Sequence, residues 1–250
     1  MSLKAFIPSL LVAFGVPWLL IIVFPYLKMN HIEPVEFAGV DVDGGEGVYT
    51  TSRDGIVTLG SEVYGQEGCY YCHSQLVRPT YAGSDIWRDN LGGLSKTSNN
   101  PDTRRETHAW DFDGEHVAHV GIQRVGPDLS NFGRRLTHYL KPGSDLTPEQ
   151  WVFNHLWDPR NKTGYEPDDQ HLYSGSVCPS KKGLFEVKDA KLSRADGVAL
   201  PTEEGKPAKV AIPGARARAL AGYLLSLKKD TLNAPLPEAL NYTPVAKTAK

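Results

Sequence analysis

The stretch CYYCHSQLVRP, from Cys69 to Pro79, contains two cysteines separated by two residues, with a histidine directly after the second. In proteins with this C-x-x-C-H pattern, the two thiols attach haem c covalently and the adjacent histidine becomes an axial ligand of the iron. We therefore predict that Cys69 and Cys72 form thioether bonds to one haem c and that His73 is its proximal ligand.

Two other uses of paired cysteines fit the rest of the chain less well. A structural zinc site needs a second pair of ligands, but the third cysteine, Cys178, has no cysteine near it in the sequence. A thioredoxin-like redox pair is expected beside a β-α-β pattern, which the sequence does not show. Three cysteines are also too few for a scaffold held together by disulfides.

Length and composition predict one domain with extensions. The chain has 250 residues, a formal net charge of −2 and a pI of about 6.4. Because there is no excess of basic residues, the composition predicts no nucleic-acid partner. The 24 glycines and 18 prolines predict many turns and irregular loops around a modest set of helices.

A long apolar run near the N-terminus, from Phe6 to Leu27, contains no charged residue and exceeds the ~20 residues that a membrane-spanning helix needs. It predicts an anchor rather than a cleaved signal peptide, because it is longer than the ~7–15 apolar residues of a signal peptide and no A-x-A-like cleavage site follows. Pro17 and Pro25 favour packing against other transmembrane helices. Lys4 and Lys28 lie at opposite ends, so charge does not decide the orientation.

The remaining pattern predicts short helices separated by long loops. Residues 58–68 can form a helix that runs into the cysteines, with Val63 and Tyr64 as its apolar contacts. The segment TPEQWVFNHLWDPR has an N-cap at Thr147 and a capping box, and its helix should end before Pro159. The segment ARARALAGYLLSLKK closes the domain with apolar residues on one helical face.

These features divide the chain into four parts. Residues 1–29 are the predicted anchor, 30–57 a linker, 58–230 the haem domain and 231–250 a loosely attached tail. Within the haem domain, we expect the irregular region 186–213 to pack against the haem edge or a partner subunit.

Two segments resemble class I cytochromes c. RVGPDLSNFG resembles the segment in which a proline carbonyl accepts a hydrogen bond from the proximal histidine, which makes Pro127 the candidate acceptor for His73. AGYLLSLKK resembles the C-terminal helix that crosses the C-x-x-C-H helix, although an ordinary core helix has the same pattern. The resemblance implies a mainly α fold: a single N-terminal transmembrane helix and a class I cytochrome c domain with long irregular loops.

A narrower resemblance rests on several motifs together: EGCYYCHSQLVRP, GPDL, W-x-x-N-H-L-x-D-P-R and S-x-x-P-x-x-x-x-LFE. With the single anchor, they resemble the membrane-anchored monohaem subunit of cbb3-type haem–copper oxidases over most of residues 5–230. The most specific part is the combination of Ser74, Gln75, Arg78 and Pro79.

The resemblance implies a role rather than a catalytic activity of the chain alone. The subunit would receive electrons from another c-type cytochrome and pass them to the catalytic haem–copper oxidase subunit, which reduces oxygen. It also implies a single-pass protein of the bacterial inner membrane, in contact with the lipid bilayer, with its haem domain on the periplasmic side.

One position departs from that family, in which a methionine of an S-x-M-P stretch is the sixth iron ligand. Here GSVCPSKKGLFE has Cys178 at the position of that methionine. The only methionines, Met1 and Met29, lie at the N-terminus and just beyond the anchor. We predict Cys178 as the sixth ligand, with His171 or His155 as alternatives and an open position as a third arrangement.

Other polar residues are weaker candidates. Arg134 and Arg135 can pair with haem propionates or face solvent. His116 and His119 have an i, i+3 spacing that suits a metal, but in a polar loop we expect them to be solvated.

Two other functions stay open at this point. The small cytochrome c subunit of a nitric oxide reductase-like complex shares one anchor and one haem, although the residues after the C-x-x-C-H motif favour the oxidase. A haem-based gas or redox sensor would use an open sixth position at the iron. A sensor would also need a signalling output domain, which the sequence does not predict.

Overall fold

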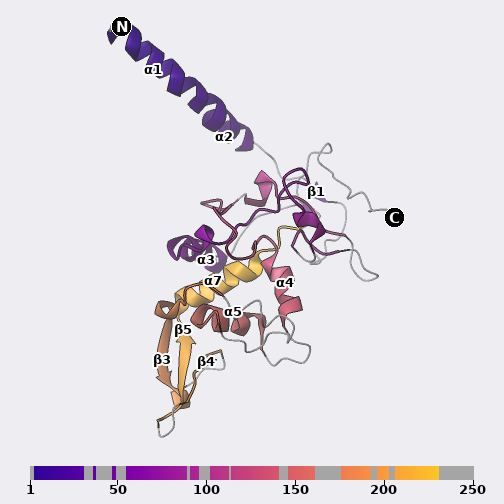
Figure 1. Ribbon diagram of the computed structural model, residues 1–250, viewed down its shortest axis with the longest axis vertical. Helices are drawn as coiled ribbons and strands as arrows, with labels where there is room; N and C mark the ends of the chain where they lie inside the picture. Colours follow the sequence, from indigo (N-terminus) through magenta and orange to yellow (C-terminus); the bar gives the residue numbers. More distant parts are fainter. Residues whose placement is uncertain are drawn as a thin grey trace.

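The structure is a computed structural model of the chain (Figure 1). It describes residues 3–30, 36–37, 47–48, 55–88, 91–95, 102–112, 114–140, 146–160, 176–192, 196–202 and 206–230. The predicted tail, most of the predicted linker and the candidate ligand His171 lie outside these residues.

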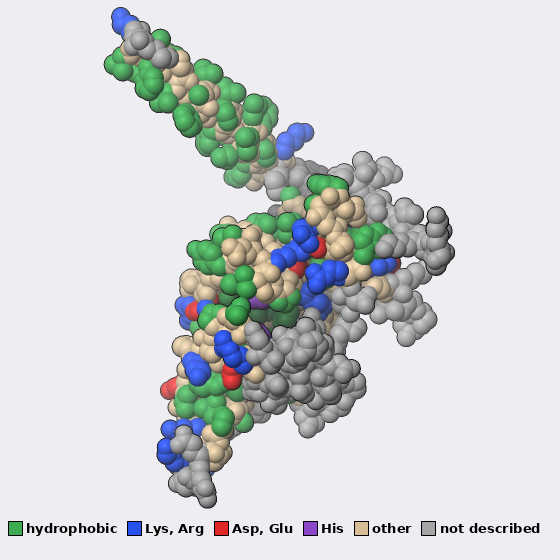
Figure 2. Space-filling model, viewed as in Figure 1, with side chains coloured by type: hydrophobic (Ala, Val, Ile, Leu, Met, Phe, Trp, Pro, Cys, Tyr) green, Lys and Arg blue, Asp and Glu red, His purple; other side chains and the backbone are tan. Residues whose placement is uncertain are grey.

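One continuous helical segment lies at the N-terminus. It consists of α1 (Leu3–Trp18), the π-helical turn η1 (Leu19–Val23) and α2 (Phe24–Met29). An 18-residue window within residues 3–28 has a mean hydropathy of 2.4, and hydrophobic side chains predominate along this helix in Figure 2. The segment is long and apolar enough to cross a membrane, in agreement with the predicted anchor.

The π-helical turn lies directly before a proline. At its end, the N–H of Phe24 donates to the carbonyl of Leu19, five residues earlier. Pro25 has no N–H, and in a regular α-helix its ring would crowd the carbonyl of Ile21, four residues before it. The wider turn accommodates this proline without ending the helix.

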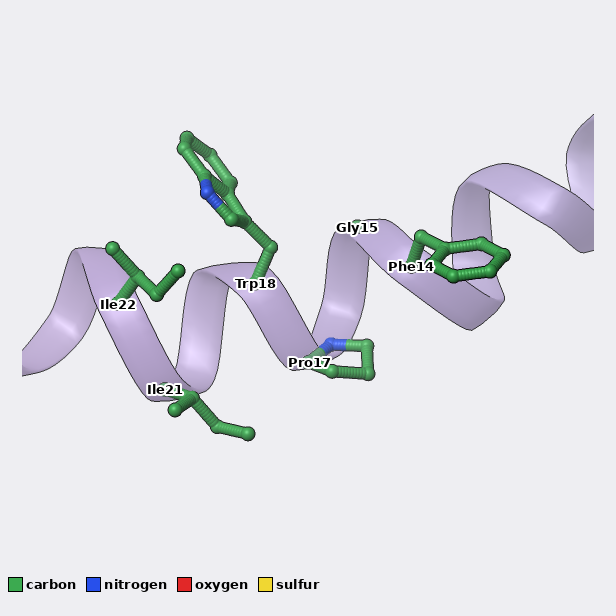
Figure 3. Close-up of a pocket in the computed structure, with 6 residues that line it drawn as sticks. All are labelled: Phe14, Gly15, Pro17, Trp18, Ile21 and Ile22. Atoms are coloured by element: carbon green, nitrogen blue, oxygen red, sulfur yellow. The ribbon is translucent and has the colours of Figure 1, made fainter. Parts of the chain in front are cut away.

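The side chains of α1 and η1 leave a shallow apolar depression on this helix (Figure 3), lined by Phe14, Gly15, Pro17, Trp18, Ile21 and Ile22. Trp18 and Ile22 project to the same side of the helix in this view, and Ile21 points the opposite way. The depression is an open face of a single helix, since no residue of α1 is buried against another described element.

The folded domain is built on the crossing of α3 (Gly55–Gln66) and α7 (Ala215–Ser226). At the crossing, a Cβ on Gly60 would overlap the carbonyl oxygen of Ala219 and lie 2.6 Å from the Cβ of Tyr223. Glycine therefore permits the two backbones to approach this closely. α7 also contacts α4 and α5, so it lies at the centre of the helical layer (Figure 1). The largest fully buried apolar side chains of this core are Val63, Tyr64, Leu136, Val152, Leu220, Tyr223 and Leu227.

α3 confirms the helix that was predicted before the cysteines, with different ends. It begins at Gly55, three residues earlier than expected, and ends at Gln66. Val63 and Tyr64 are buried, as predicted. Gly68 has a φ of 72°, a left-handed conformation that suits glycine and turns the chain into the first cysteine.

α5 (Pro148–Trp157) confirms the second predicted helix. Thr147 accepts a hydrogen bond from the Gln150 N–H, and the Gln150 side chain accepts one from the Thr147 N–H, so the capping box is complete. The helix ends before Pro159, as predicted. The sequence did not predict α4 (Phe132–Tyr139), an eight-residue helix with two arginines in its first half.

The remaining elements are short: η2 (Cys69–Tyr71), η3 (Asp85–Trp87), η4 (Ala109–Phe112), η6 (Lys182–Leu184), η7 (Ala190–Leu192), β1 (Glu36–Phe37) and β2 (Gly47–Val48). β1 and β2 pair in antiparallel fashion within the predicted linker.

The region 186–213 contains an antiparallel sheet, so the expectation of irregular structure there is wrong. β5 (Lys209–Pro213) lies between β3 (Phe185–Asp189) and β4 (Val198–Ala199), and the sheet projects from the helices (Figure 1). Most side chains of β3 are exposed, so this edge strand lacks the apolar alternation that marks a half-buried strand. The pairing with β5, rather than local sequence, defines it.

Candidate functional site

The two cysteines and the histidine of the C-x-x-C-H motif share one tight turn. The N–H groups of Cys72 and His73 both donate to the carbonyl of Cys69, at 3.1 and 3.0 Å. Burial raises the pKa of the Cys69 thiol to about 12. A reactive redox cysteine needs a lowered pKa instead, so this environment disfavours the thioredoxin-like alternative.

His73 contacts a residue that lies 54 positions later in the chain. Its Nδ1 is 2.8 Å from the carbonyl oxygen of Pro127, to which it donates. Burial lowers the pKa of His73, although the hydrogen bond to Pro127 acts in the opposite direction. The ring is therefore a neutral imidazole at neutral pH with its proton on Nδ1, which leaves the lone pair of Nε2 for a metal.

Gly126 supports the same imidazole from the side. A Cβ at this position would overlap Cε1 of His73 and lie 2.7 Å from Nδ1 and 2.8 Å from Nε2. The N–H of Gly126 also donates to the carbonyl of Cys72, at 2.9 Å. The glycine thus leaves room for the ring, while its backbone joins the loop to the cysteine turn.

The segment that contains Cys178 is fastened between the ends of two helices. The N–H of Lys181 donates to the carbonyl of Leu156 near the end of α5, and Lys181 Nζ donates to the carbonyl of Glu67 just after α3. Burial raises the pKa of Cys178, the positive charge of Lys181 acts in the opposite direction, and the nearby Cys72 adds to the increase. The structure therefore brings all three cysteines into one region.

His155 also lies in this region, on α5. Its ring stacks on Trp151 with the ring centroids 5.3 Å apart. Burial, with a smaller contribution from the nearby His73, lowers the pKa of His155 to about 4. The imidazole is therefore neutral at neutral pH and able to act as a metal ligand.

The two consecutive arginines of α4 have different surroundings. Arg134 Nε is 3.0 Å from Oδ1 of the buried Asp230, so this guanidinium is held by a protein carboxylate. Arg135 is only 4% exposed and donates to the carbonyl of Asp128, and its Nε has no hydrogen-bond partner among the described residues. Since its charge contributes to the lowered pKa of His73, Arg135 is the arginine close to the site.

The paired histidines of the loop before Arg124 do not form a metal site. His116 is exposed, with Nδ1 4.0 Å from the Glu62 carboxylate, whereas His119 is buried and its Nε2 bonds to the carbonyl of Ser61 at 3.0 Å. The expectation of solvated histidines is thus correct for His116 and wrong for His119. In the described part of the chain, no three histidine, cysteine or acidic side chains form a group that would hold a metal.

Sequence reasoning singled out Ser74, Gln75 and Arg78 as a pattern but missed their partners. The structure pairs Ser74 with Asp128, Gln75 with Tyr223 and Arg78 with Asp85. Those partners lie up to 148 residues away. The only sequence signal for these pairings was Asp128 of the GPDL motif, because it directly follows Pro127, the predicted partner of His73.

Comparison with known proteins does not assign the chain to a family, because no protein-family model and no curated protein matches it. The function of the chain is therefore inferred from its own motifs and from the geometry of the site around His73.

Proposed function

We propose that the chain is a membrane-anchored electron-transfer subunit with one covalent haem c. Cys69 and Cys72 would form the thioethers, and His73 would be the proximal iron ligand. The observation that carries the proposal is the hydrogen bond from His73 Nδ1 to the Pro127 carbonyl, because it gives the histidine of a C-x-x-C-H turn the tautomer and orientation of an iron ligand.

The residues of this site fit a covalently bound haem c. Two thiols and an imidazole stand on one turn, the imidazole is neutral, and a buried Arg135 Nε without a partner is suited to a haem carboxylate. When bound there, haem c supplies one-electron Fe(III)/Fe(II) chemistry. The chain would hold the proton on Nδ1 of His73 and keep the proximal ring in place between Gly126 and Pro127.

For the sixth iron position we propose Cys178, with His171 and then His155 as the next candidates. The fastening of the Cys178 segment beside the cysteine turn supports Cys178. A thiolate is a stronger donor than a thioether and carries a negative charge, so it would stabilise ferric iron and lower the potential.

Within this proposal, the domain is a class I cytochrome c domain. The crossing of α3 and α7 at Gly60 supports it, because the C-x-x-C-H helix and the C-terminal helix cross in that family. The complex would be a cbb3-type terminal oxidase, in which this subunit passes electrons from another c-type cytochrome to the catalytic haem–copper subunit. The helix over 3–28 would anchor it in the bacterial inner membrane, with the haem domain in the periplasm.

A denaturing gel stained for haem peroxidase activity tests the cofactor. The 27.5 kDa chain should give one stained band, because thioether bonds survive denaturation. A Cys69→Ser, Cys72→Ser double variant should lose the stain, and the matched Cys178→Ser variant should keep it. A colourless wild-type band contradicts the proposal.

Purification in mild detergent tests the partners. A catalytic subunit that contains haem and copper and reduces oxygen should co-purify with this chain. A partner that reduces nitric oxide but not oxygen would instead assign the chain to the nitric oxide reductase alternative.

A further inference from the structure

A polar cluster with two buried aspartates lies beside the His73–Pro127 hydrogen bond, and we call it the clamp: Ser74, Arg78, Asp85, Arg124 and Asp128. We propose that the clamp positions the Pro127 carbonyl against His73 and thereby sets the donor strength of that imidazole toward the iron. This inference rests on the proposed function. It gives a role to the polar residues that follow the C-x-x-C-H motif.

The inner part of the clamp joins the residues that directly follow the two bonded groups. Ser74 follows His73 and Asp128 follows Pro127, and Ser74 Oγ donates to Asp128 Oδ2 at 2.6 Å. The same carboxylate accepts from the N–H of Leu76 at 2.8 Å, and its other oxygen accepts from the Ser130 N–H at 2.9 Å. Asp128 is 1% exposed, so water does not compete for these bonds.

Arg124 holds the other side of the same loop. Its Nε donates to Ser74 Oγ at 2.6 Å, and its guanidinium also contacts the carbonyl of Leu76. The N–H of Leu129 donates to the carbonyl of Ser74 at 2.7 Å. Pro127 thus lies between two anchored positions, residues 124 and 128, and its carbonyl has little freedom to move away from His73.

The outer part of the clamp supplies charge balance. Asp85 is fully buried, with Oδ1 2.8 Å from Arg78 Nη2 and Oδ2 2.8 Å from Arg124 Nη1. Burial alone would raise the pKa of Asp85, but hydrogen bonds from Arg78 and Arg124 outweigh it and hold the pKa well below the usual range. Two arginines therefore surround the buried Asp85 carboxylate, and Arg124 also contacts Asp128.

A positioning role accounts for this cluster better than stability does. Apolar residues of similar volume often stabilise a fold as well as buried ion pairs, because removing charges from water is costly. The clamp, however, can fix the orientation of the Pro127 carbonyl, because its hydrogen bonds are made by the residues next to His73 and Pro127. A firmly held carbonyl makes the Nδ1 proton bond stronger and the imidazole a better donor, which favours ferric iron.

Ser74→Ala tests the role without changing any charge. It should raise the midpoint potential of the haem and accelerate solvent exchange of the His73 Nδ1 proton in the ferrous protein, both measured on the full chain in detergent. Ser74→Thr keeps the hydroxyl and should restore both values. If Ser74→Ala does not accumulate, the isosteric Asp128→Asn replaces it and should raise the potential further, because it also removes a negative charge.

Thr103→Val is the matched control. Thr103 Oγ1 also donates to a buried carboxylate at 2.6 Å, that of Asp230, but neither residue bonds to His73, Pro127 or the clamp in the described structure. The Thr103→Val variant should have a lower melting temperature and an unchanged haem potential. If Ser74→Ala lowers the melting temperature but does not change the potential or the proton exchange, the positioning role is overturned. A wild-type chain without haem overturns the proposed function itself, before any variant is compared.

Discussion

The most direct test of the site geometry is Gly126→Ala. The new Cβ would lie 2.7 Å from Nδ1 and 2.8 Å from Nε2 of His73, whereas atoms that are not bonded normally stay ~3.5 Å apart. The backbone of Gly126 is not in the left-handed region, so alanine is excluded by space alone. The imidazole must therefore move by roughly 1 Å relative to the loop, which stretches or misaligns its bond to Pro127.

The size of the effect follows from two contributions. Overpacking this half-buried contact costs ~1–3 kcal/mol, and loss of the hydrogen bond costs about 1 kcal/mol more, so the free energy of unfolding should fall by about 2–4 kcal/mol. For a chain of this size, that corresponds to a melting temperature lower by about 5–15 °C. Thermal unfolding followed by circular dichroism measures the shift, and electron paramagnetic resonance of the proposed ferric haem would report the changed ligand geometry.

Gly183→Ala is the control for that measurement. A Cβ at Gly183 would have no atom within 4 Å, so the free energy of unfolding should stay within about 0.5 kcal/mol of the wild type. A Gly126→Ala protein that matches this control in melting temperature and keeps the wild-type resonance spectrum would show that His73 does not pack on Gly126 as described.

Three further predictions follow from the fold and the proposed function. Gly60→Ala should lower the free energy of unfolding by ~1–3 kcal/mol because its Cβ overlaps Ala219 on α7, whereas Gly55→Ala, with no atom near its Cβ, should not, as denaturant titration will show. Cys178→Met should raise the haem potential and introduce the weak far-red absorption of a ferric iron–methionine bond; if Cys178→Ala leaves the ferric resonance spectrum unchanged, the thiol is not the ligand. Protease added to intact spheroplasts should digest residues 30–250, and protection there would place the haem domain on the cytoplasmic side.

Features that depend on a few neighbouring residues were predictable from the sequence. The capping box of Thr147 and Gln150 is an interaction across three positions, and its helix has the predicted start. The apolar run near the N-terminus is uninterrupted, so a helix of membrane-spanning length was the direct expectation. In both cases the interacting groups lie in adjacent turns of the chain.

Features that depend on pairing between distant segments were not predictable in the same way. Nothing in the sequence distinguishes Arg134 from Arg135, because Asp230, which binds the first, lies 96 residues away. β3 has exposed, largely charged side chains, and its partner β5 comes only after two further elements.

The sequence by itself determined the chemistry that is available: two thiols and an imidazole on one turn, and a cysteine where the resembled family has methionine. Only the tertiary structure decided how these groups are held. Pro127, Asp128 and Arg124 meet the motif across about 50 residues of chain, and the hydrogen bonds and ion pairs among them form only once folding brings these distant segments together. The sequence therefore identifies the candidate haem-binding residues, but only the folded structure shows which distant residues form hydrogen bonds and ion pairs with them.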